Sequence, residues 1–157
     1  MCALLDANAV GDVLAADRSA AAHAFFNWIT RGRGKLIVAR QIHDELRTHS
    51  RFDVWYREAI QQGRILRVND DEVEARAIEL RKARICRSDD EHLIAAAQVG
   101  GARLLYSNDR ALQRDFKNKD LIDQPRGKVY TTLHGSEYTK SHDRLLGNRS
   151  LCARGNR

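Results

Sequence analysis

The sequence has few of the residues that break or cross-link a chain. Its 157 residues include one proline, Pro125, so no earlier residue forces a helix to end. Three cysteines are an odd number, and the spacing of Cys2, Cys86 and Cys152 matches neither a zinc site nor a redox pair. We therefore expect three free thiols in a reducing cytosol.

Long apolar runs are also absent. The first run, Cys2–Leu5, is followed by Asp6 and is too short for a signal peptide. No stretch approaches the roughly 18 consecutive apolar residues that would cross a membrane. These absences predict a cytoplasmic protein with no membrane partner.

Several common enzyme motifs are missing as well. No GxSxG elbow of a serine hydrolase occurs. The glycines around Arg33 lack the GK[ST] ending of a phosphate-binding loop. Without a GxGxxG motif, a dinucleotide cofactor is not expected.

The composition fits one folded domain with a basic surface. Apolar residues make up 43%, enough for a core, and the net charge of +6 with a pI near 9.5 is compatible with nucleic-acid binding. We expect the domain to span residues 1–138, followed by a basic, flexible tail over residues 139–157. Against one acid, Asp143, this tail holds the bases Lys140, Arg144, Arg149, Arg154 and Arg157.

Short apolar runs alternate with segments of helical periodicity. Ser19, Asn69 or Asp70, and Ser88 are expected to begin three of these helices, and Gly100–Gly101 to end the third. Strands separated by helices predict an α/β fold, a three-layer α/β/α sandwich around a parallel sheet of about five strands. The expected strands are Cys2–Leu5, Leu36–Ala39, Ile65–Val68, Arg103–Ser107 and Lys128–Thr131.

Acidic residues follow several of these strands. Ligands bind beyond the carboxyl ends of strands in an open parallel sheet. Asp6 ends the first strand, Glu45 lies on the helix after the second, Asp90 begins the helix before the fourth, and Asp109 follows the fourth. Carboxylates that converge repel one another unless a cation neutralises them, and oxygen ligands of this kind suit Mg²⁺ or Mn²⁺. Such ions could support chemistry on a phosphodiester.

Each acid also has a purely structural interpretation. Asp6 and Asp109 could cap helices or form turns, and Asp90 could complement a helix dipole. Glu45 alone reads as a solvated helix residue. The metal-site hypothesis therefore depends on the acids occurring together.

At this point the sequence resembles the PIN-domain family of ribonucleases, similar to the VapC type. The resemblance is carried by LLDAN at the start, HDEL after the second strand, SDDEHLIAAA, and GARLLYSNDRALQRDF, which together span residues 2–116. QPRGKVY resembles the final strand of some members. Within SDDEHLIAAA, Asp89 and Glu91 are alternatives to Asp90, and Asp44 is an alternative to Glu45.

The resemblance implies a PIN-like nuclease domain that hydrolyses RNA with a divalent metal. We expect an endonuclease, although the sequence does not distinguish it from an exonuclease. The hypothesised hydrolysis leaves a 5′-phosphate and a 3′-hydroxyl. It places Asp6, Glu45, Asp90 and Asp109 as catalytic, metal-holding acids. It gives Asn8 and Ser107 supporting positions. Asp115 is a further acid that could contribute or be solvated, and His92 is expected to face away from the site.

Many members of this family are toxins that pair as dimers and are blocked by an antitoxin. The expected partners are therefore an RNA substrate, an antitoxin protein and a second copy of the chain. Six bases could guide RNA toward the metal: Arg110, Arg114, Lys117, Lys119, Arg126 and Lys128. The alternative is a non-catalytic PIN-like scaffold that binds RNA or protein.

Overall fold

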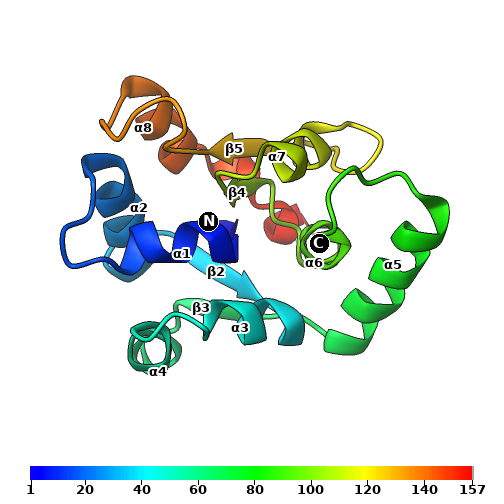
Figure 1. Cartoon of the computed structure of the whole chain (residues 1–157), viewed down its shortest axis with the longest axis horizontal. Coiled ribbons are helices and arrows are strands. Elements are labelled where there is room, and N and C mark those ends of the chain that lie inside the picture. Colours follow the sequence, from blue (N-terminus) through cyan, green and yellow to red (C-terminus); the bar gives the residue numbers. More distant parts are fainter. Residues whose placement is uncertain (157) are drawn as a thin grey trace.

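Five short strands form one parallel sheet through the centre of the molecule (Figure 1). The computed structural model describes residues 1–156, and neighbouring strands pair in the order β3-β2-β1-β4-β5. The strands are β1 Cys2–Leu5, β2 Lys35–Val38, β3 Ile65–Arg67, β4 Leu104–Tyr106 and β5 Lys128–Tyr130. Every expected strand is confirmed, and the ends differ by at most one residue.

Helices cover both faces of this sheet, as the alternating pattern predicts. In Figure 1, α1 and α2 lie on one side, whereas α5 and α6 lie on the other. The helices are α1 Ala7–Leu14, α2 Ala20–Thr30, α3 Arg40–Leu46, α4 Phe52–Gln61, α5 Asp70–Ala83, α6 Glu91–Gly100, α7 Arg110–Lys117 and α8 Lys140–Gly147, followed by the 3-10 turns η1 Arg149–Leu151 and η2 Ala153–Asn156. This is the predicted three-layer α/β/α sandwich.

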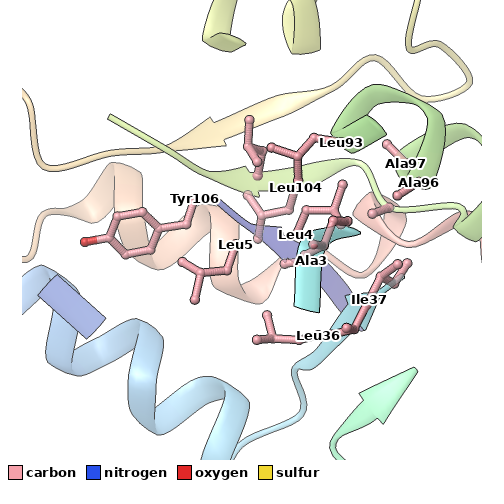
Figure 2. Close-up of a cluster of buried hydrophobic side chains, with 14 of the residues drawn as sticks. Ala3, Leu4, Leu5, Leu36, Ile37, Leu93, Ala96, Ala97, Leu104 and Tyr106 are labelled. Carbon is pink, nitrogen blue, oxygen red and sulfur yellow. The ribbon is translucent and has the colours of Figure 1, made fainter. Parts of the chain in front are cut away.

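The central strand is apolar on both of its faces. Leu4 and Leu5 point to opposite sides of the sheet, yet each is almost fully buried. Figure 2 shows Leu4 near Leu93 of α6, and Leu5 on the other side near Tyr106 of β4. A strand covered by helices on both faces needs this continuous apolar run, and each buried leucine contributes about 1.5–3 kcal/mol.

Helix ends follow the sequence signals with one exception. Ser19 caps α2 by accepting a hydrogen bond from the Ala22 backbone, and Asn69 caps α5. Gly101 ends α6 with a φ of 82°, a conformation that favours glycine. The expectation that Ser88 caps α6 is wrong: that helix begins at Glu91, with Asp90 at the preceding position.

The C-terminal segment differs from the expected flexible tail. Residues 140–156 form α8 and two 3-10 turns, with Leu146 and Leu151 buried in the core. The Arg103 amide also donates to the Leu151 carbonyl at 2.8 Å. Two well-spaced leucines anchor the segment although large apolar residues are scarce in it. Arg157, counted among the bases of the tail, lies outside the described residues.

The expectation of three free thiols is wrong. Cys2 on β1 and Cys152 form a disulfide, and Cys86 alone is free. The partners are 150 positions apart in sequence, so spacing and parity could not reveal the pair. They meet because Cys152 forms a bridge with Ala102, just before the strand that neighbours β1. Over residues 1–156, no helix is both long and apolar enough to cross a membrane.

Candidate active site

Two of the four acids follow β1 and β4, the neighbouring strands between which the order of strand addition reverses. The chain runs outward from β1 to β3, then returns to the other side of β1 to add β4 and β5. Asp6 follows β1 and Asp109 follows β4, and the Asp6 amide donates to the Tyr106 carbonyl at 3.0 Å. Ligands bind at such a switch point because the loops diverge there.

Ser107 links these two acids. Its hydroxyl donates to Asp6 Oδ2 at 2.7 Å and accepts from the Asp109 backbone amide at 3.0 Å. Asp6 and Ser107 are both buried. Burial raises the pKa of Asp6, and so do the charges of Asp109 and Glu45, while the hydrogen bonds from Ser107 and the Asn8 backbone oppose the rise. Ser107, which was expected in a supporting position, thus contacts both Asp6 and Asp109.

Asp109 keeps its capping function as well. One carboxylate oxygen accepts from the Leu112 amide at 3.1 Å and begins α7. The structural interpretation of this residue and its place beside Asp6 are therefore compatible, since a carboxylate has further lone pairs for a ligand.

Asn8 supports the neighbouring loop rather than the acids directly. Its side-chain oxygen accepts from the Asn108 amide at 3.3 Å. The Asn108 amide group in turn donates to Asp12 at 3.2 Å and to Thr132 at 2.9 Å. This polar network joins the ends of β1, β4 and β5, and sequence reasoning did not identify its members Asn108, Asp12 and Thr132.

Glu45 is paired with a histidine that was expected to face away. His92 Nε2 lies 3.0 Å from Glu45 Oε2, and the histidine is only 3% exposed. The hydrogen bond with His92 is the largest cause that lowers the pKa of Glu45, and a hydrogen bond from Gln41 adds to it. Asp90 lies outside α6, so the helical angular spacing that separated it from His92 does not apply.

Asp90 feels all three other acids. Its pKa is raised to about 6, first by burial and then by the charges of Asp6, Asp109 and Glu45, while the charge of His92 opposes the rise. Like charges disfavour the ionised form of a carboxyl group, as burial does. The charges of the other three acids that the sequence singled out therefore reach Asp90.

The neighbouring acids serve other contacts. Asp89 is exposed, and Glu91 lies 3.8 Å from Arg81. Asp44 is exposed and lies 3.9 Å from His43. Among these alternatives only Asp90 and Glu45 belong to the electrostatically linked group.

Asp115 is neither a site residue nor solvated. It is 2% exposed and accepts hydrogen bonds from the backbone amides of Arg87 and Ser88 at 2.9 Å each. The Ser88 hydroxyl adds a third donor at 2.6 Å. Asp115 therefore anchors the loop that leads to Asp90.

The donor set suits a hard divalent cation by its chemistry. The four acids are oxygen ligands whose mutual repulsion a cation would relieve. Within residues 1–156, however, no three His, Cys, Asp or Glu side chains are grouped closely enough to hold one ion between them. Mg²⁺ commonly binds one or two carboxylates directly and keeps several waters, so the donors fit that looser mode.

The six bases expected around the stretch after Asp109 are all exposed. They surround α7 and the approach to β5, next to the loop that carries Ser107 and Asp109. The site thus combines a partly buried acidic centre with a basic margin. No protein-family model matches this chain, and no curated protein matches it.

Proposed function

We propose that this chain is a divalent-metal-dependent ribonuclease of the PIN-domain type. The observation that carries the proposal is the electrostatic coupling of four carboxylates at the switch point of a parallel sheet. Burial together with these charges raises the pKa of Asp90 to about 6. Clustered acids in a chain of net charge +6 suit a metal that acts on a polyanion.

Asp6, Glu45, Asp90 and Asp109 would hold Mg²⁺ or Mn²⁺. When bound, such an ion activates water and stabilises negative charge on the scissile phosphate and the departing oxygen. The residues of this chain supply position and charge. Ser107 keeps the buried Asp6 carboxylate oriented and favours its ionised form, as does the hydrogen bond of His92 for Glu45.

The direct test is cleavage of structured and single-stranded RNAs by purified protein in Mn²⁺, Mg²⁺ or EDTA. Asp6→Asn should abolish cutting because it removes the buried charge while its amide oxygen can still accept from Ser107. Asp17→Asn is the matched control, since that acid is exposed and removes the same charge.

Metal-dependent cutting that survives in Asp17→Asn and disappears in Asp6→Asn supports the proposal. Equal cutting by Asp6→Asn and the parent would indicate a contaminating nuclease and contradict it. If the parent neither cuts nor melts at a higher temperature with metal, the chain is a scaffold that binds RNA or protein.

A further inference from the structure

A cleft between α7, β5 and α8 is lined by bases without acids. It has a volume of about 520 Å³ and lies beside the loop that carries the acidic site. Among the described residues that line it, the ionisable ones are Lys117, Lys128, His134 and Arg144. Figure 1 shows the three elements together at one edge of the molecule. The pocket between α3, α5 and α6, by contrast, has acids as well as bases in its lining.

The positive charges of the cleft are not neutralised within the protein. Lys117, Lys128 and Arg144 are exposed, and none forms an ion pair with another residue in the described part of the chain. Like charges that line one concave surface reinforce each other's potential, which attracts a polyanion.

The floor of the cleft connects it to the acids. Gln113 and Thr131 line the cleft. The Gln113 amide donates to the Ser107 carbonyl at 2.7 Å, and the Thr131 hydroxyl donates to Asn108 at 2.7 Å. Since the Ser107 hydroxyl also donates to Asp6, two hydrogen bonds link the floor of the cleft to the acidic site.

One wall of the cleft is a fixed helix. His142 on α8 bonds to the Thr131 carbonyl through Nε2 at 2.8 Å, and its ring packs 4.7 Å from that of Tyr130. Leu146 of the same helix is buried in the core. Arg144 is therefore presented on an ordered element, so little backbone entropy is lost when it meets a ligand.

We propose that this cleft binds the phosphodiester backbone of an RNA strand and leads it to the acidic site. The proposal rests on the proposed function in taking RNA as the ligand. Lys117, Lys128 and Arg144 each contact a phosphate, while Gln113 and Thr131 form the polar floor. Because the contacts are to phosphates, the cleft positions the strand without reading its sequence.

The test is binding of a fluorescein-labelled single-stranded RNA in EDTA, followed by anisotropy at several salt concentrations. The cleft variant combines Lys117→Gln, Lys128→Gln and Arg144→Gln. The control variant combines Arg33→Gln, Arg57→Gln and Lys82→Gln, which removes three positive charges from exposed positions outside the cleft. Thermal melting checks that both variants remain folded.

Each phosphate contact to a single strand contributes about 0.7 to the slope of log affinity against log salt, or roughly fivefold in affinity at 0.1 M salt. The cleft variant should therefore bind roughly 100-fold more weakly, with a slope smaller by about 2. The control variant should stay within about threefold of the parent. A neutral-backbone peptide nucleic acid of the same sequence should not bind.

Equal weakening by the two variants would mean that charge acts diffusely, and the proposal would fall. An absence of RNA binding by the parent would also overturn it and favour an acidic protein as the occupant. Because EDTA prevents metal-dependent cleavage, binding is measured apart from the nuclease. If the cleft variant binds and cuts RNA as well as the parent does, the proposed nuclease function is supported and the proposed role of the cleft is contradicted. If RNA binding depends on the cleft but no metal supports cutting, the role of the cleft is supported and the nuclease function is contradicted.

Discussion

The pKa of Asp90 is affected by the charges of the other three acids. Its pKa rises to about 6 because burial and the charges of Asp6, Asp109 and Glu45 all disfavour its ionised form. In the unfolded chain the same carboxyl group titrates near its usual value of 3.8. Ionisation of Asp90 therefore opposes folding when no cation is present.

The sign of the resulting pH dependence can be worked out. Below about pH 4 Asp90 is protonated in both states, and between pH 4 and 6 the unfolded state releases the proton first. Stability in EDTA should fall over this range, by on the order of 1 kcal/mol after allowance for solvent screening. Asp90→Asn should remove that loss and be more stable than the parent at pH 7. Urea unfolding of the parent and of Asp90→Asn at pH 4, 5, 6 and 7 measures the two free energies of unfolding.

The control for this prediction is Asp89→Asn, an exposed neighbour that removes the same charge. It should leave the pH profile of the parent unchanged. Mn²⁺ at pH 7 should raise the melting temperature of the parent and of Asp89→Asn, but less that of Asp90→Asn. A less stable Asp90→Asn at pH 7 in EDTA would contradict the electrostatic interpretation.

At this scale the sequence pointed to the acids and to Ser107, but not to His92 as the partner of Glu45. Asp6, Glu45, Asp90 and Asp109 could be found because strand ends are visible in the pattern of apolar runs and parallel strands share one edge. His92 could not, since its orientation depends on where α6 begins, and a cap at Ser88 places that start two residues too early. The Ser88 hydroxyl instead donates a hydrogen bond to Asp115, a contact between segments far apart in sequence.

Among the larger elements, the loop between α5 and α6 determines where Asp90 sits. Its amides at positions 87 and 88 donate to Asp115 on α7, and the Ser88 hydroxyl does so as well. Through these three donors, the buried carboxylate of Asp115 joins the loop to α7. The position of Asp90 thus depends on Asp115, a residue outside the group of four acids.

Asp115→Ala should destabilise the protein by about 2–4 kcal/mol, because it leaves two buried or half-buried amides and a hydroxyl without a partner. Urea unfolding at pH 7 measures the loss. Asp120→Ala, at an exposed acid three residues beyond α7, should change the free energy of unfolding by less than about 0.5 kcal/mol. Similar small losses in both variants would show that the anchor contributes little.

The starts of α2 and α5 were predictable from their capping residues, whereas α1 and α8 were not expected. Ser19 and Asn69 were expected to begin helices, and their side chains accept the hydrogen bonds that cap α2 and α5. Helix α1 follows Asp6 without an interval, so its start is hidden by the end of β1. Helix α8 has one buried residue, Leu146, and its stability comes from packing on α2 and β5 that the sequence does not display.

On the scale of the whole molecule, the two ends of the chain are joined. Cys2 lies on the central strand four residues before Asp6. It forms a disulfide with Cys152, which follows α8, the helix that carries Arg144. The C-terminal segment also adds backbone hydrogen bonds beside Gly101 and Arg103. The acidic site and the basic cleft are therefore parts of one closed structure, which a count of cysteines could not predict.

Opening this link should cost stability on a scale set by the length of chain it closes. A cross-link between positions 150 residues apart restricts the unfolded chain strongly, and native disulfides of this kind contribute about 2–5 kcal/mol. Cys152→Ser should lower the free energy of unfolding by that amount, measured with urea under oxidising conditions, whereas Cys86→Ser, at the free thiol, should not reproduce it. Dithiothreitol should bring the parent down to the level of Cys152→Ser and leave that variant unchanged. If the reductant has no effect on the parent, the two cysteines are not joined in solution, and α8 is held by its leucines and His142 alone.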